Sequence, residues 1–151
     1  MKLAELLIER SDCQKRISEL ESAVRHCLRV QEGDEPPQSP QKLLAEIKAA
    51  NARLAELVWL IARANYETKI DGKTTLAQAL ARRDAIKAER DTLIDVIEEA
   101  SRRDFRGTKS EIKTVVTVDV AELQKQSDKL ARQYRELDTK IQERNWTTEI
   151  E

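Results

Sequence analysis

Apolar residues recur at every third or fourth position through four long segments of the chain, which is the spacing of an amphipathic helix. The pattern predicts helices over about residues 2–31, 40–66, 75–103 and 119–145. At a rise of ~1.5 Å per residue, each helix would be roughly 40–45 Å long. The predicted fold class is therefore mainly all-α.

The predicted helices are matched in length, and connections of about ten residues join the first three, which favours antiparallel packing. A chain of 151 residues fits one domain with a real core. We therefore expect residues 1–151 to form a single helical domain, either a four-helix bundle or a pair of coiled-coil hairpins. A long extended coiled coil is the alternative.

The connection between the third and fourth predicted helices has a different pattern. Ile112, Thr114, Val116 and Val118 alternate with residues on the opposite face, and several of these side chains are β-branched. We expect a short β-hairpin or a single strand within residues 105–118. An isolated hairpin is marginal in water, so this element would need a partner to pack against.

Excess apolar residues widen three of the helices beyond a single seam. In residues 57–62, LVWLIA, the seam uses Leu57 and Ile61, while Trp59 and Leu60 fall on its flanks. Apolar surface of this kind on a chain with 36% charged residues is typical of an interface. The alternative is a tryptophan that covers the edge of the bundle. We predict a homo-oligomer whose interface includes Val58, Trp59, Leu60, Ile8 and Ile94.

Polar residues interrupt the apolar seams at similar depth in two helices, Arg10 in the first and Arg83 in the third. A buried arginine requires a carboxylate partner, and Asp138, Asp84 or Glu56 lie at suitable heights. Three roles remain open: fixing the helix register, forming a small anion pocket, or reaching solvent. We predict one polar cluster at one pole of the bundle, made of Arg10, Asn65, Arg83, Asp138 and Asn145.

The charge balance and the few candidate catalytic residues argue against nucleic-acid binding and enzyme activity. With 27 basic and 28 acidic residues the net charge is −1, without the basic excess usual for nucleic-acid binding. The basic run from Arg102 to Lys113 is interrupted by Asp104 and Glu111, and we interpret it as a solvated helix end. His26 is the single histidine, and motifs for phosphate or zinc binding are absent from the sequence. We expect no enzyme activity, no cofactor, no metal and no nucleic-acid partner.

The first residues, MKLAELLIER, carry two glutamates among the leucines and do not form a signal peptide. Cys13 and Cys27 lie about 21 Å apart along one predicted helix, too far to be bridged. Two reduced thiols predict a cytoplasmic protein.

Several stretches resemble the septicolysin-like family of small bacterial proteins. They include MKLAELLIERSDCQKRI, VQEGDEPP, LAQALARRDAIKAERDTL and the ending SEIKTVVTVDVAELQKQSDKLARQYRELDTKIQERNWTTEI. The resemblance covers nearly the whole chain and implies a cytolysin, with no catalytic residues to transfer. A membrane-active cytolysin, whose apolar faces turn outward onto a membrane, is therefore the alternative function. The residues themselves favour a non-enzymatic, self-associating helical protein.

Overall fold

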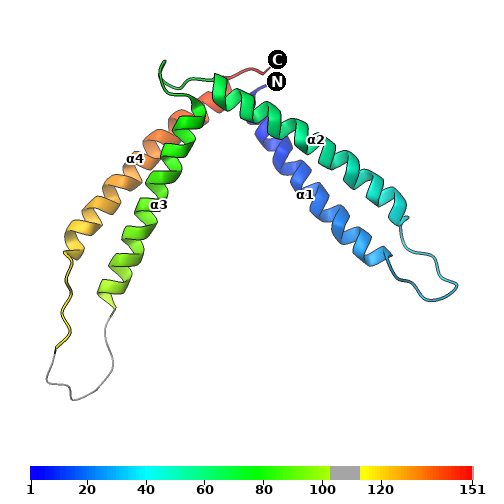
Figure 1. The fold of residues 1–151 in the computed structure, drawn as a ribbon, viewed down its shortest axis with the longest axis horizontal. Coiled ribbons are helices and arrows are strands. Elements are labelled where there is room, and N and C mark those ends of the chain that lie inside the picture. Colours follow the sequence, from blue (N-terminus) through cyan, green and yellow to red (C-terminus); the bar gives the residue numbers. More distant parts are fainter. Residues whose placement is uncertain (103–112, 151) are drawn as a thin grey trace. The chain divides into compact units, whose positions relative to one another are not determined.

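The computed structural model describes residues 1–102 and 113–150. The described residues form four helices, which are α1 (Leu3–Cys27), α2 (Pro40–Glu67), α3 (Leu76–Ser101) and α4 (Val120–Thr147) (Figure 1). The prediction of an all-α protein with four long helices is confirmed.

The predicted β element is not seen in the part of it that the structure describes. Residues 113–118 do not form a strand, and residues 105–112 of the prediction lie outside the described residues. Alternating β-branched residues favour a strand only where another backbone segment can pair with them. Nothing in the described chain pairs with residues 113–118, where Val115 and Val116 are exposed.

The structure divides into two compact units. Unit 1 comprises Met1–Ala77 and Gln142–Glu151, and unit 2 comprises Gln78–Ile141. The divisions fall inside α3 and α4, so each unit is described by itself. The predicted single domain stays a prediction.

In unit 1, α1 and α2 pack antiparallel along their length (Figure 1). Ser39 caps α2 by accepting a hydrogen bond from the backbone N–H of Lys42 at 3.4 Å, and Pro40 occupies the first turn. The α1 helix ends at Cys27 rather than near residue 31, before a polar segment that contains Gly33 and two prolines. The buried seam between the two helices consists of Leu20, Val24, Cys27, Leu43, Leu57, Ile61 and Ala64.

Backbone hydrogen bonds close unit 1 at the chain ends. The N–H of Leu3 donates to the carbonyl of Thr148 at 2.9 Å, and the N–H of Ile150 donates to the carbonyl of Met1 at 2.8 Å. Lys2 and Glu149 form an antiparallel bridge between these bonds. The two ends of the chain are therefore tied together by main-chain pairing.

A tight loop separates α2 from α3. Asp71 accepts hydrogen bonds from the backbone N–H groups of Lys73 and Thr74 at 3.1 and 2.7 Å. Gly72 lies between them at φ +81°, a conformation that other residues rarely adopt. The N–H of Leu76 then donates to the carbonyl of Thr68 at 2.7 Å, which fixes the start of α3.

Unit 2 contains most of α3 and α4, which lie side by side and run antiparallel (Figure 1). Its buried residues are few among those described: Ala79, Ser127 and Ile141. The apolar seam positions are only half-buried, namely Ile86, Leu93, Ile94, Ile97, Leu123, Leu130 and Leu137.

Two leucines of α2 test which face of this helix stabilises the fold. Leu57 is 0% exposed in the seam, whereas Leu44 is 53% exposed. Leu57→Ala should lower the free energy of unfolding by about 2–5 kcal/mol, because it removes buried methyl groups and leaves a cavity. Leu44→Ala should change it by less than about 0.5 kcal/mol. Urea unfolding of both variants checks this, and equal losses would contradict the assigned seam.

An ion pair between α1 and α2 predicts a pH dependence. Arg53 donates a hydrogen bond through Nε to Oε1 of Glu9 at 2.8 Å, and this bond lowers the pKa of Glu9 from its usual 4.5. Its contribution to stability is complete above pH 4.5 and is lost as the pH falls through the lowered pKa. Because both side chains are partly exposed and screened by solvent, the effect on stability should be small.

Glu9→Gln should therefore lose less stability than the wild type when thermal unfolding is followed from about pH 5 to about pH 2. Glu21→Gln removes an exposed carboxylate of the same helix and serves as the control, with the wild-type slope. Equal slopes for all three proteins would show that the Glu9–Arg53 pair does not stabilise the hairpin.

Candidate functional site

The face of α2 that is turned away from α1 carries a second row of residues at helical spacing. We call this row the outer stripe. All five of its residues are exposed, and successive members are three or four positions apart. With about 100° per residue, the row lies opposite the buried seam of Leu57 and Ile61. The outer stripe consists of Ala52, Ala55, Trp59, Ala62 and Tyr66.

Trp59 is the centre of the outer stripe and is 61% exposed. The guanidinium of Arg63 lies over its ring, 5.6 Å from the ring centre, which is within the range of a cation–π interaction. One turn earlier, Glu56 accepts a hydrogen bond from Nη1 of Arg53 at 3.0 Å. The stripe is thus an apolar face with an acidic and a basic residue along one flank.

The residues predicted for an interface do not lie on one face. Val58 and Trp59 are exposed on α2, whereas Leu60 is half-buried. Ile8 is exposed on α1, on the side of that helix away from its buried seam. Ile94 is half-buried in unit 2. Self-association through these residues stays a prediction.

The sequence reasoning did not identify the alanines of the outer stripe or Tyr66. The signal was present as a second 3–4 repeat in the segment that supplies the buried seam. Three of its five members are alanines, which add little to a hydropathy pattern, so only the block around Trp59 was recognised.

The predicted polar cluster has members in both units. Arg10, Asn65 and Asn145 lie in unit 1. Asn145 is buried and donates through Nδ2 to Oε1 of Gln142 at 3.4 Å. The Nε of Arg10 is buried and has no hydrogen-bond partner in the part of the chain that the structure describes.

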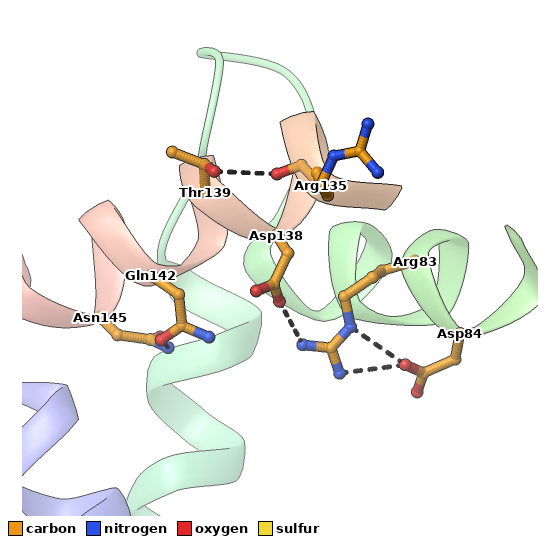
Figure 2. Close-up of polar contacts among 7 residues, drawn as sticks. All are labelled: Arg83, Asp84, Arg135, Asp138, Thr139, Gln142 and Asn145. Carbon is orange, nitrogen blue, oxygen red and sulfur yellow. Dashed lines mark hydrogen bonds and ion pairs between the residues drawn. The ribbon is translucent and has the colours of Figure 1, made fainter. Parts of the chain in front are cut away.

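The unit 2 members, Arg83 and Asp138, are in contact. Nη1 of Arg83 donates to Oδ1 of Asp138 at 2.9 Å, which links α3 to α4 (Figure 2). Nε and Nη2 of Arg83 both donate to Oδ1 of Asp84, at 3.2 and 3.0 Å. The guanidinium also lies 6.0 Å from the centre of the Tyr134 ring. Burial alone would lower the pKa of Arg83, but the hydrogen bonds to Asp138 and Asp84 outweigh it and raise the pKa.

Beside this contact, α3 and α4 form a shallow groove of about 250 Å³. Lys87 donates to Oδ2 of Asp91 at 2.6 Å, and this bond raises the pKa of Lys87. The Nε of Arg90 is buried without a hydrogen-bond partner among the described residues. The groove is lined by Lys87, Arg90, Asp91, Ala131, Tyr134 and Arg135.

The Arg83–Asp138 contact favours one register of α3 against α4, because it joins side chains at fixed heights on the two helices. Whether Arg10, Asn65 and Asn145 share one cluster with Arg83 and Asp138 stays a prediction. Among residues 1–102 and 113–150, no group of three or more His, Cys, Asp or Glu side chains could hold a metal ion. No helix in the described chain is long and apolar enough to cross a membrane.

The two acidic partners of Arg83 should differ in their effect on stability. The side chain of Asp138 is 31% exposed, and that of Asp84 is 68% exposed. Asp138→Asn should lower the free energy of unfolding by about 1–2 kcal/mol, since it weakens a charged hydrogen bond to a partly buried guanidinium. Asp84→Asn should cost less than about 0.5 kcal/mol. Denaturant unfolding measures both, and an equal or reversed order would refute the assigned role of Asp138.

The chain is similar to known proteins over nearly its whole length. The family model described as "Family of unknown function (DUF6847)" matches residues 10–150. A crystal structure described as a functionally unknown conserved protein from Corynebacterium diphtheriae is similar, with a TM-score of 0.93 and 40% sequence identity. The match covers 100% of this chain and 99% of that chain. None of the curated proteins matches.

These matches correct the resemblance drawn from the sequence. Neither the matching family nor the solved relative is described as septicolysin-like, so that resemblance is wrong. The cytolytic alternative depended on it and has no remaining support. The chain belongs to the family of unknown function DUF6847.

Proposed function

We propose that this protein is a non-enzymatic helical protein that associates with copies of itself through the outer face of α2. The observation that carries the proposal is Trp59, which is 61% exposed at the centre of an apolar row. The chain as a whole is 36% charged, whereas the five positions of the outer stripe carry no charged residue. Apolar surface of this kind is favourable only when it is removed from water.

The side chains of α2 support an assembly surface rather than a surface for a charged ligand. Tyrosine and tryptophan are enriched at interfaces because each combines a large apolar area with a polar group. Small residues beside them allow a second helix to approach closely. Tyr66, Trp59 and the alanines of the outer stripe supply both features on one face.

The proposal includes no catalytic role. His26 is exposed at the end of α1, and the neighbouring Cys27 is buried in the seam. The other thiol, Cys13, donates to the carbonyl of Ala50 at 3.2 Å and fills a half-buried position between α1 and α2. These contacts favour packing roles for both cysteines. A net charge of −1 likewise favours a protein partner over nucleic acid.

The proposal places the assembly in the cytoplasm. Both cysteines are free thiols, and reduced thiols are typical of that compartment.

Trp59→Glu tests the proposal. The variant should have a lower assembly mass by light scattering than the wild type, because a carboxylate at the centre of the stripe would have to be desolvated. Its helix content by circular dichroism should be unchanged, because Trp59 lies outside the buried seam. Leu28→Glu is the matched control: Leu28 is also 61% exposed but lies at the end of α1, so this variant should keep the wild-type mass.

Two outcomes would contradict the proposal. One is a wild-type mass equal to that of a single chain, 17.3 kDa, at all concentrations tested. The other is a Trp59→Glu variant that stays folded and keeps the wild-type mass, since α2 would then not be the surface of assembly.

A further inference from the structure

The outer stripe has the spacing of a coiled-coil seam. Relative to Trp59, its other members lie seven and four positions before, and three and seven positions after. A repeat of alternating threes and fours keeps one face turned toward a partner helix. The buried seam of α2 already packs against α1, so the outer stripe faces away from its own hairpin and is spaced for a further helix.

The order of large and small residues in the stripe selects a direction for that partner. If a second copy of α2 packs antiparallel with the two Trp59 residues near the symmetry axis, Tyr66 of one copy lies opposite Ala52 of the other. In the same register Ala62 lies opposite Ala55. A parallel arrangement would instead pair Tyr66 with Tyr66 and Ala52 with Ala52, which matches volumes poorly in those two layers.

The charges beside the stripe select the same direction and register. Glu56 and Arg63 lie on one flank of α2, seven residues apart, or two helical turns. In the antiparallel register Glu56 of each copy lies beside Arg63 of the other, so the contact is formed twice. The carboxylate of Glu56 is 65% exposed beside Arg53, which leaves it accessible to a second basic group. A parallel pair would place neither residue beside an opposite charge.

The area available is that of a modest but specific dimer. Each tryptophan or tyrosine removes roughly 150–250 Å² from water when fully buried. Two copies contribute four such rings, or roughly 600–1,000 Å² at full burial. Trp59 and Tyr66 are 61% and 76% exposed before association, so the alanines and the flanking side chains have to supply the remainder of the roughly 1,000 Å² expected of a specific interface.

We infer that α2 packs antiparallel against α2 of a second copy in a symmetric dimer, with Trp59 at the axis and Glu56 of each copy paired with Arg63 of the other. This inference rests on the proposed self-association and adds its partner, direction and register. Symmetric self-complementary contacts of this kind close a dimer and leave no free end for further growth.

Charge reversal tests the register. Glu56→Arg alone and Arg63→Glu alone each place like charges opposite each other, so each should raise the dimer dissociation constant at least tenfold in sedimentation equilibrium. The double variant restores opposite charges and should return to within about threefold of the wild type. Arg82→Glu, an exposed reversal on α3, is the control and should dissociate as the wild type does.

Disulfide trapping tests the direction independently of stability. Equal amounts of Ala55→Cys and Ala62→Cys chains, mixed and oxidised, should give a covalent dimer, because these positions face each other across the antiparallel pair. Each variant alone should give little more than the wild type, since identical positions are about seven residues out of register. The native Cys27 is buried and Cys13 half-buried, so the wild type provides the background.

The outcomes separate the inference from the proposed function. A wild type that is monomeric at all concentrations overturns both. If the wild type dimerises but neither charge reversal changes its dissociation constant and no mixed disulfide forms, the inferred register is wrong and the proposed self-association remains. Efficient trapping of Ala55→Cys with itself would show a parallel pair and overturn the inferred direction.

Discussion

A two-helix hairpin can bury only one face of each of its helices, and this constraint governs unit 1. In this hairpin the buried face of α2 is the one that packs against α1, and it carries Leu57, Ile61 and Ala64. The outer face of the same helix then has no helix of its own hairpin to cover it. Alanine, tryptophan and tyrosine at coiled-coil spacing on that face are the residues that a second helix would need. The proposed partner helix would cover the face that the hairpin leaves open.

The α1–α2 hairpin buries more apolar side chains than the α3–α4 hairpin does. Among the described residues, α1 and α2 together carry ten buried apolar residues. In unit 2, the seam residues are half-buried and an arginine–aspartate contact joins the helices instead. Partly exposed ion pairs contribute little free energy compared with buried apolar area. Local opening in unit 2 should accordingly require less free energy than opening of the α1–α2 seam.

The helices could be predicted from the sequence because their signals are local. Apolar residues at 3–4 spacing and Ser39 followed by Pro40 are sufficient to place α2 without knowledge of the rest of the fold. The β element could not be judged in this way. A strand depends on its pairing partner, and the alternation of residues 113–118 says nothing about whether one is present. The division into two units is equally non-local.

The outer stripe could likewise be predicted only in part from the sequence. Trp59 was recognisable because it stands in a block of six apolar residues in a highly charged chain, whereas the alanines of the outer stripe have no distinct hydropathy. These alanines can be assigned to the outer face only when the buried seam of α2 is known, because that seam shows which alanines pack against α1 and which are turned away from it. The Arg83–Asp138 contact follows from antiparallel register alone, but the two hydrogen bonds from Arg83 to Asp84 depend on a rotamer that no spacing rule supplies.

The arginines that interrupt the seams show how polar residues define the structure without adding much to its stability. A buried guanidinium costs free energy unless its donors are satisfied, and Arg83 meets this requirement through Asp138 and Asp84. The Nε atoms of Arg10 and Arg90 do not meet it among the described residues. An apolar residue at these positions would cost less in the isolated hairpin, so stability alone does not favour arginine there. Arg83 does penalise a shift of one helix along the other, because a shift by one turn would move its charge away from Asp138. Half-buried seams such as that of unit 2 specify register weakly, and the charged contact compensates for the apolar contacts that they lack.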